Sequence, residues 1–360
     1  MRWRTNRFFD GAVRFPQPDP GILRFHESLA GYQPTSLNSL DGLADQLGVG
    51  GIRVKDESQR FGLNAFKGLG ASWAMHRFLE ADKCRPVTFA TATDGNHGRA
   101  VAWAARLAGQ RAVIFVPRQT VAARIDAIRG EGAKVVVVDG NYDDAVGAAD
   151  TESRANGWQV LSDTAYRGYM EIPEWVIDGY STMFREMEGE NPDMVIVQAG
   201  VGGLAAAAVR HFFRNGRGKR PVIVCVQPEQ ADGLIESASA TDGEAHPTRG
   251  NQQTIMAGLA CGMPSLAAWP VVKRGAQMFL SIADKFALDA MRRFYFPASG
   301  DPRITSGETG AAGLAGLIAL CREPQFAEAK AQLGISKDSS ILLINTEGDT
   351  DPENFRRLVA

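Results

Sequence analysis

Short apolar runs alternate with helix-like segments along most of the chain, and this alternation constrains the fold more than any other feature of the sequence. The runs are three to five residues long, and most are followed by a stretch with apolar residues at helical spacing. The expected strands are 52–54, 87–90, 112–116, 135–138, 194–197, 222–226 and 341–344, and the expected helices are 69–78, 96–108, 121–128, 144–155, 204–213 and 311–320. Strands that alternate with helices form βαβ units. The sequence therefore predicts an α/β fold with a parallel sheet.

Length and composition narrow the class of protein further. The 360 residues suffice for about two domains, and the 44% hydrophobic and 22% charged content is that of an ordinary globular chain rather than a disordered one. With 39 basic and 41 acidic residues, there is no electrostatic reason to expect nucleic acid or an anionic membrane as a partner.

The sequence also lacks the features that mark membrane insertion, secretion or a structural metal. No stretch approaches 18 uncharged apolar residues, and the first eleven residues contain no apolar signal-peptide core. The cysteines at 84, 225, 261 and 321 form no CxxC pair, so neither a metal cluster nor a disulfide framework is expected. A reducing compartment, the cytoplasm, fits this cysteine usage.

A lysine ends the polar, glycine-containing loop that follows the first expected strand. The loop begins with Lys55-Asp56-Glu57-Ser58 and ends at Lys67, between Phe66 and Gly68, where a helix is expected to start. Desolvation would lower the pKa of the Lys67 ammonium and make its amine nucleophilic enough for a Schiff base. The alternative is a solvated lysine at the start of a helix.

The segment Thr91-Ala92-Thr93-Asp94-Gly95-Asn96-His97-Gly98 follows a strand and opens a helix. Backbone N–H groups at a helix N-terminus bind anions such as a carboxylate, and the Asn96 amide can donate to an oxygen of a bound ring. Alternatively, Asp94 or Asn96 is simply the N-cap and Gly95 makes the turn. His97 is either a base or a packed side chain.

A glycine-rich loop, Gln198-Ala199-Gly200-Val201-Gly202-Gly203-Leu204, lies between a strand and an alanine-rich helix. Glycines allow close approach of the backbone to a phosphate, and the helix start supplies N–H donors. Gly200, Gly202 and Ala205 also satisfy the loose dinucleotide pattern G-x-G-x-x-A, but Glu229 comes late for the acidic residue that this pattern expects. A plain tight turn is the third interpretation.

Two further polar segments lie near the C-terminal part of the expected sheet. Ser306 to Leu314 is a loop that opens a helix, in which Glu308 is either functional or only an N-terminal helix charge. Leu343 to Asp351 runs from the last strand into a turn, and ligands are met at such carboxyl edges of α/β sheets. Capping of the final helix by Asp351 is the simpler alternative.

In this order, the motifs resemble the fold-type II pyridoxal-phosphate enzymes, the tryptophan synthase β family, from about Lys55 to Thr346. Within that family the chain is most similar to the diaminopropionate ammonia-lyases. Three features carry this likeness: Asp94 where ordinary dehydratases have serine, the segment 163–175 (DTAYRGYMEIPEW), and the segment 346–355 (TEGDTDPENF).

The resemblance implies a two-domain fold in which each domain is an open, mostly parallel sheet flanked by helices. Residues 1–80 and 165–360 would form the large cofactor-binding domain, and residues 81–164 the small one, with the active site in the cleft between them. The resemblance implies a homodimer as well, and no metal-ligating residues are expected.

The resemblance also assigns roles to residues. Lys67 would bind pyridoxal phosphate as a Schiff base, Asn96 would contact the ring hydroxyl, and Thr346 or Asn345 the ring nitrogen. The remaining implied cofactor contacts are Phe66, Gly200, Val201, Gly202, Gly203, Leu204 and Glu308. The implied substrate contacts are Thr93, Asp94, Gly95, His97, Asp163 and Tyr166.

The implied reaction is the α,β-elimination of 2,3-diaminopropionate to pyruvate and two ammonia. Asp94 and Asp163 would complement the additional ammonium of this substrate. They would act as bases for its D and L forms, respectively, if burial raises their pKa values. Lys67 is the alternative proton carrier, and Asp163 could instead be a turn or cap residue.

Three rival functions are compatible with parts of the sequence. A serine- or threonine-type dehydratase of the same fold would share Lys67 and the glycine-rich loop. A non-catalytic pyridoxal-phosphate-binding protein would leave the candidate acid–base residues without a role. An NAD-dependent oxidoreductase would leave Lys67 and the turn from Thr93 to Gly98 unexplained.

Overall fold

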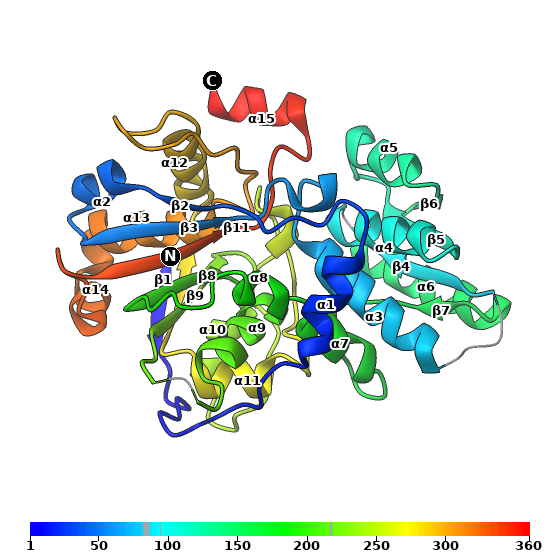
Figure 1. Cartoon of the computed structure of the whole chain (residues 1–360), viewed down its shortest axis with the longest axis horizontal. Helices are drawn as coiled ribbons and strands as arrows, with labels where there is room; N and C mark the ends of the chain where they lie inside the picture. The colour runs from blue at the N-terminus through cyan, green and yellow to red at the C-terminus, as the bar shows by residue number, and fades with distance from the viewer. Residues whose placement is uncertain (82–85, 94, 217) are drawn as a thin grey trace.

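The computed structural model describes residues 1–360 except 82–85, 94 and 217, and the described residues form two β-sheets (Figure 1). The strands are β1 (Arg2–Thr5), β2 (Leu37–Ser39), β3 (Gly51–Asp56), β4 (Thr88–Ala92), β5 (Arg111–Pro117), β6 (Lys134–Val138), β7 (Gln159–Val160), β8 (Met194–Gln198), β9 (Val222–Pro228), β10 (Met278–Ile282) and β11 (Ser340–Asn345). The α-helices are α1 (Pro20–Ser28), α2 (Asp41–Leu47), α3 (Lys67–Ala81), α4 (Asn96–Leu107), α5 (Ala122–Gly130), α6 (Tyr142–Asn156), α7 (Glu171–Gly179), α8 (Ser181–Arg185), α9 (Gly203–Phe212), α10 (Gly233–Ser239), α11 (Trp269–Gly275), α12 (Asp284–Tyr295), α13 (Ala312–Arg322), α14 (Ala327–Leu333) and α15 (Pro352–Val359).

The larger sheet has seven strands in the order β1-β10-β9-β8-β11-β3-β2. Its five inner strands run parallel, while β1 and β2 pair antiparallel at the two edges. The smaller sheet has the order β6-β5-β4-β7 and is parallel throughout. The prediction of open, mostly parallel sheets flanked by helices is confirmed. The antiparallel edge strands and β10 were not foreseen.

Strands β8 to β11 of the larger sheet are buried on both faces, which explains why they read as mostly continuous apolar runs rather than alternating ones. In β8, Val195 and Val197 face the core beneath α9 and α11, while Met194 and Ile196 face the core beneath α12 and α13. Successive side chains of a strand point to opposite faces, so one short run fills two cores.

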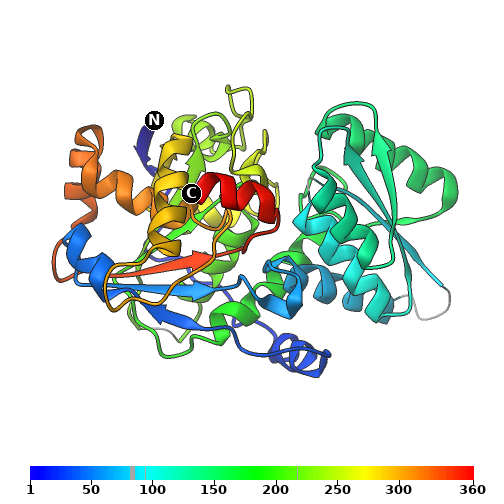
Figure 2. The ribbon, with the colours of Figure 1, turned by 90° about the horizontal axis from the view of Figure 1, so that it is seen from above.

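The two sheets form two lobes, with α3 on the path between them (Figure 2). The chain enters α3 from the larger sheet, and α3 packs against both α4 and α7. All four strands of the smaller sheet lie between residues 88 and 160. Within the described part of the chain, no helix has both the length and the apolar character needed to cross a bilayer.

Candidate active site

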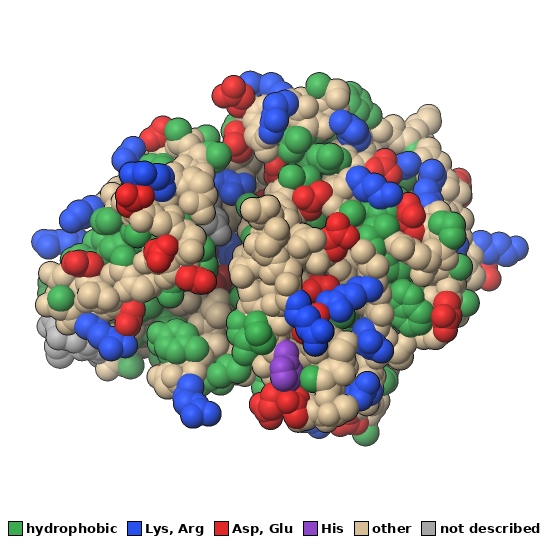
Figure 3. Space-filling model, turned by 180° about the vertical axis from the view of Figure 1, so that it is seen from behind, with side chains coloured by type: hydrophobic (Ala, Val, Ile, Leu, Met, Phe, Trp, Pro, Cys, Tyr) green, Lys and Arg blue, Asp and Glu red, His purple; other side chains and the backbone are tan. Residues whose placement is uncertain are grey.

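A pocket lies between the two sheets, and the surface is hollowed between the lobes (Figure 3). Its lining comes from segments that follow the carboxyl ends of β4, β8 and β11, together with the start of α3. Ligands of open α/β sheets bind at this edge because the loops after parallel strands converge there. The described lining includes Phe66, Lys67, Thr93, Gly95, Asn96, His97, Asp163, Gly200, Val201, Gly202, Gly203, Leu204 and Thr346, all of which the sequence singled out.

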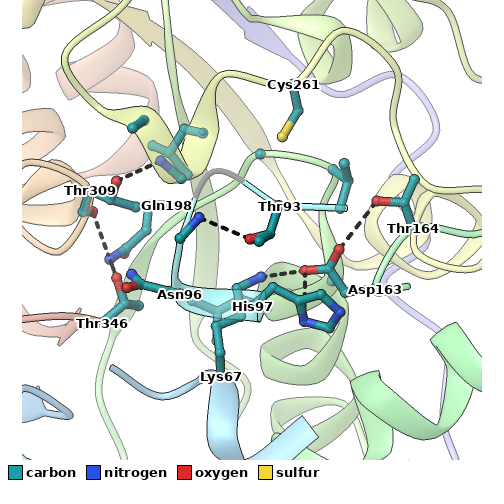
Figure 4. A pocket seen from close by; sticks show the side chains of 18 of the residues that line it. Lys67, Thr93, Asn96, His97, Asp163, Thr164, Gln198, Cys261, Thr309 and Thr346 are labelled. Carbon is teal, nitrogen blue, oxygen red and sulfur yellow. Dashed lines mark hydrogen bonds and ion pairs between the residues drawn. The ribbon is translucent and has the colours of Figure 1, made fainter. Parts of the chain in front are cut away.

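Lys67 is the first residue of α3 and lies at the centre of the pocket (Figure 4). Its Nζ donates a hydrogen bond of 2.5 Å to Oδ2 of Asp163 and lies 5.3 Å from the centroid of the Phe66 ring. The Lys67 and Asp163 side chains are 22% and 17% exposed. The pair is therefore largely shielded from water yet open toward the pocket.

The pair shifts both pKa values in the direction opposite to the one expected. Burial by itself lowers the pKa of Lys67, but the Asp163 carboxylate, together with Tyr180 and Cys261, outweighs burial and raises it. Burial by itself raises the pKa of Asp163, but the positive charges of Lys67 and, to a lesser extent, His97 lower it. In this state Lys67 is an ammonium and Asp163 a carboxylate.

His97 lies on the other side of the Asp163 carboxylate. Its Nε2 donates to the carbonyl of Leu161 at 2.9 Å, because a carbonyl only accepts. Its Nδ1 has no hydrogen bond among the described residues and lies 3.8 Å from Oδ2 of Asp163. Burial lowers the pKa of His97, so the imidazole is neutral and turns its unprotonated nitrogen toward Asp163.

The glycine-rich loop forms a cradle at the start of α9. Gly202 is the N-cap residue and has φ of +99°, a conformation that favours glycine. A Cβ atom at Gly200 would lie 3.1 Å from Sγ of Cys261 and from the carbonyl oxygen of Gly258. The first N–H groups of a helix lack helical acceptors, so this loop offers donors to an anion that approaches the backbone closely.

Thr346 follows β11 and brings its hydroxyl into the pocket lining. Nε2 of Gln198, at the end of β8, donates to Oγ1 of Thr346 at 3.0 Å. Since that oxygen already accepts, the Thr346 O–H remains able to donate to a ligand. Asn345 lies outside the described lining, where its Nδ2 donates to Oδ1 of Asp56 at 2.8 Å and to the carbonyl of Thr305 at 3.1 Å.

The start of α4 forms the other wall of the pocket. Oγ1 of Thr93 accepts from the N–H groups of Gly95 (2.9 Å) and Gly98 (3.1 Å) and so holds the turn in place. Gly98 is required by packing, because a Cβ there would lie 2.2 Å from Cγ2 of Thr93. Asn96 reaches across the pocket, where its Nδ2 donates to Oε2 of Glu347.

Besides Asn345, two residues singled out in the sequence, Tyr166 and Glu308, lie outside the described lining. Tyr166 is 48% exposed, and its ring stacks on that of Tyr169 with centroids 5.1 Å apart. Glu308 is buried outside the described lining; Asn354 donates to its carboxylate at 2.7 Å, and burial raises its pKa. Asp94 lies outside the described residues.

Several lining residues were not predicted as site residues. Gln198 begins the glycine-rich loop and Glu347 lies in the segment from Leu343 to Asp351. Their positions near Gly200 and Thr346 were the only indication in the sequence that they line the pocket. Tyr180 packs its ring 4.6 Å from that of Phe66, and burial raises its pKa to about 12. Arg124, Tyr142 and Cys261 also line the pocket and come from segments with no recognisable motif, whereas Thr309 stands in the segment from Ser306 to Leu314.

Comparison with known proteins agrees with this geometry. The family model described as "Pyridoxal-phosphate dependent enzyme" matches residues 29–345. Diaminopropionate ammonia-lyase of Escherichia coli K12 is 41% identical over 98% of this chain and 95% of its own length.

Solved structures give the same result. The crystal structure of diaminopropionate ammonia lyase from Escherichia coli in complex with D-serine has a TM-score of 0.92 and 39% identity, and the match covers 99% of this chain and 96% of that one. Threonine deaminase isoform 2 of Solanum lycopersicum shares the fold, with a TM-score of 0.76 at 21% identity over 99% of this chain and 98% of that one. The chain therefore belongs to the fold-type II pyridoxal-phosphate-dependent enzymes and, within them, to the diaminopropionate ammonia-lyase family.

Proposed function

We propose that this protein catalyses the α,β-elimination of 2,3-diaminopropionate, in its D form, its L form or both, to pyruvate and two ammonia. One observation carries the proposal: a lysine–carboxylate pair, Lys67 and Asp163, faces a pocket that also contains an anion cradle. The reaction consumes one water, since the elimination releases the β-amino group and hydrolysis releases the second ammonia.

The pocket fits pyridoxal phosphate. The loop from Gly200 to Leu204 would hold the phosphate with backbone N–H groups at the N-terminus of α9. The Thr346 hydroxyl, held by Gln198, would donate to the ring nitrogen, and Asn96 would contact the ring hydroxyl. Lys67 would hold the cofactor covalently beside the Phe66 ring. When bound, the cofactor supplies an electron sink that delocalises the negative charge at Cα of the substrate.

Asp163 gains basicity at the point in the reaction where a base is needed. Lys67 is the largest cause that holds its pKa down. Once the Lys67 amine carries no charge, burial acts on the carboxylate with less opposition, and the Asp163 pKa rises. The free Nδ1 of His97, 3.8 Å away, can then share the proton. We propose that Asp163 is the base for the L-substrate and Asp94 the base for the D-substrate, with Lys67 as the alternative carrier.

The substrate carboxylate would bind at the start of α4. The N–H groups of Asn96 and His97 lie in the first turn of this helix, where helical acceptors are missing and the dipole favours negative charge. Thr93 keeps the turn in shape through its bonds to Gly95 and Gly98. The carboxylates of Asp163 and Asp94 would complement the positive charge of the β-ammonium group. A substrate with a β-hydroxyl group carries no such charge and does not need these carboxylates.

A β-hydroxy amino acid is the second candidate substrate, giving a serine- or threonine-type dehydratase. The related Escherichia coli enzyme has a crystal structure in complex with D-serine, a hydroxy amino acid, and this complex keeps the second candidate open. The two functions share Lys67 and the phosphate cradle, so rates on the two substrates separate them.

The proposal also covers the domain boundaries, the oligomeric state and the cellular location of the protein. We propose that residues 1–80 and 165–360 form the cofactor-binding domain and residues 81–164 the small domain, in keeping with the positions of the two sheets. The resemblance to the family supports a homodimer acting in the cytoplasm, with a small amino acid as partner and no nucleic acid or membrane. Light scattering of the purified holoenzyme measures the oligomeric state.

The test is release of pyruvate and ammonia from D- and L-2,3-diaminopropionate, with serine and threonine alongside. We expect rapid turnover of diaminopropionate with two ammonia per pyruvate. Turnover of a hydroxy amino acid without turnover of diaminopropionate would overturn the substrate while keeping Lys67. Absence of ammonia from every substrate, with the cofactor bound, would support the non-catalytic alternative.

A further inference from the structure

Glu347 lies where three segments of the chain meet at the pocket. It follows β11, pairs with Ala65 in an antiparallel bridge just before Lys67, and accepts from the N–H of Gly307 through its carbonyl at 3.1 Å. The residue is 3% exposed and belongs to the pocket lining. A carboxylate in such a place needs donors for both of its oxygens.

Both oxygens of Glu347 accept from neutral donors. Oε1 accepts from the backbone N–H of Thr309 at 3.1 Å, and Oε2 accepts from Nδ2 of Asn96. The first donor is fixed by the backbone, which leaves the carboxylate little freedom to turn. The second joins α4, beside the smaller sheet, to the segment after β11 in the larger one.

This contact determines how the Asn96 amide is turned. An ionised carboxylate only accepts, so Asn96 must present its NH₂ group to Glu347. An amide has a second N–H on the same nitrogen, and Asn96 lines the pocket. Without Glu347, the two sides of the amide are nearly equal in size, and the terminal torsion that exchanges them is soft.

We propose that Glu347 is a positioning residue that holds the Asn96 amide with its second N–H turned toward the bound cofactor. The inference rests on the proposed function, in which Asn96 contacts the ring hydroxyl of pyridoxal phosphate. Glu347 acts on the cofactor through Asn96 and not by its own contact. Glu347 stands in the segment 346–355 that carries the family resemblance, but the sequence analysis assigned it no role.

A double-mutant cycle on cofactor binding tests this coupling. The variants are Glu347→Gln, Asn96→Ala and their combination, with the affinity for pyridoxal phosphate and the absorption spectrum of the holoenzyme as readouts. We expect Glu347→Gln to weaken cofactor binding about tenfold and to shift the absorption band, because a hydrogen bond to a charged group is lost. In the Asn96→Ala background, the same change should alter the affinity less than twofold. An equal effect in both backgrounds would overturn the inference, as would no effect in either.

Exchanging the carboxylate and the amide between positions 96 and 347 tests whether Glu347 orients the Asn96 amide or only links the two segments. In the Asn96→Asp, Glu347→Gln double variant, the new glutamine can donate to the new aspartate, so the bridge is kept but no N–H faces the cofactor. We expect its melting temperature to recover relative to Asn96→Asp alone, while its cofactor affinity stays low. Recovery of both would mean that the bridge alone matters, and the inference would fail.

A matched control uses a carboxylate with the same kind of donors elsewhere. Asp301 accepts from the N–H groups of Gly42 (2.8 Å) and Leu43 (2.9 Å) at the start of α2. Asp301→Asn should leave cofactor affinity and spectrum unchanged; a loss like that of Glu347→Gln would show a nonspecific effect and overturn the assignment. These readouts do not depend on turnover, so wild-type protein that binds the cofactor but ignores diaminopropionate would defeat the proposed function alone.

Discussion

Two lysine–carboxylate pairs, Lys55 with Glu186 and Lys67 with Asp163, are built differently, although their lysines are only twelve residues apart in the sequence. The Lys55 ammonium donates to Oε2 of Glu186 at 2.6 Å and to the carbonyl of Thr35 at 2.7 Å, and it is 1% exposed. The guanidinium of Arg60 completes this cluster with bonds to both Glu57 and Glu186. The Lys67–Asp163 pair instead faces an open pocket.

The difference separates a structural pair from a functional one. In the first cluster each charge is enclosed and bonded, so no acceptor or donor is left for a ligand. In the second, a neutral His97 nitrogen without a hydrogen bond stands beside the Asp163 carboxylate, which keeps a proton acceptor available. Residue type alone does not distinguish the two pairs, whereas the exposure of the side chains to the pocket and the saturation of their hydrogen bonds do.

Loss of Lys67 should have the largest effect. We expect Lys67→Ala to lower kcat/KM for diaminopropionate by about 10⁴-fold or more, because the proposed covalent attachment point of the cofactor is removed. The check is pyruvate formation, together with borohydride treatment of the cofactor-loaded protein. A borohydride-fixed linkage that survives in Lys67→Ala would show that another lysine holds the cofactor.

The two candidate bases should respond differently to the two enantiomers. Asp163→Asn should lower the rate on L-diaminopropionate by about 10²- to 10⁴-fold, and Asp94→Asn should do so for the D form. Rates of both variants on both enantiomers provide the check. Full activity of both variants on both forms would eliminate the assignment of one base to each enantiomer.

The saturated cluster should respond in stability rather than in rate. Lys55→Met removes one cation from Glu186 while keeping an unbranched side chain, and we expect the free energy of unfolding to fall by about 3–5 kcal/mol. Urea unfolding measures this loss. The folded fraction should retain its kcat within about twofold, and a large loss of kcat without a loss of stability would break the distinction between the two regions.

The neighbourhood of this cluster should also make the fold sensitive to acid. His26 lies beside it, with Nδ1 2.6 Å from Oγ1 of Thr182 and Nε2 2.9 Å from the carbonyl of Leu69. Burial lowers the pKa of His26 to about 3. In the unfolded chain His26 therefore binds a proton below about pH 6.5, whereas in the folded chain it binds one only below about pH 3.

The free energy of unfolding should thus fall as the pH is lowered from 6.5 toward 3, by about 1.4 kcal/mol per pH unit from this one group. Urea unfolding of the wild type and of His26→Gln at several pH values measures the slope. In His26→Gln, the contribution of His26 to the slope of the unfolding free energy against pH should be absent. An identical slope in both proteins would place the acid sensitivity elsewhere.

The smallest effect is expected at Tyr166, which the resemblance assigned to the substrate. Its ring is exposed and stacks on Tyr169 outside the described lining. Tyr166→Phe should change kcat/KM less than about twofold. A tenfold loss of kcat/KM would show that Tyr166 takes part in the reaction and that the functional region extends beyond the described pocket lining.

Local patterns predicted the framework of the site well. Buried parallel strands read as apolar runs, and the turns after β4, β8 and β11 carry glycine and polar residues that stand out in the sequence. For this reason Lys67, the Thr93–His97 turn and the loop from Gly200 to Leu204 could be singled out from the sequence, and the family resemblance assigned them to one cleft between two domains.

Contacts between distant segments could not be predicted in the same way. Lys67 and Asp163 are 96 residues apart, and nothing local indicates that they pair. The expected pKa shifts were wrong in direction because burial was considered without the opposite charge beside it. The bond from Asn96 to Glu347 likewise depends on how the two lobes meet, which periodicity does not encode.

The central position of β11 has a consequence for how the protein is made. This strand lies between β8 and β3, and Asn345 at its end bonds to Asp56, 289 residues earlier in the chain. At about 5–20 residues per second, a ribosome needs about 15–60 s to bridge that separation. Until then β3 and β8 have open edges, a condition that favours aggregation and makes folding slow. Since Thr346 follows directly, the proposed cofactor site is complete only after β11 has been synthesised, and a fragment that ends before β11 lacks the Thr346 hydroxyl.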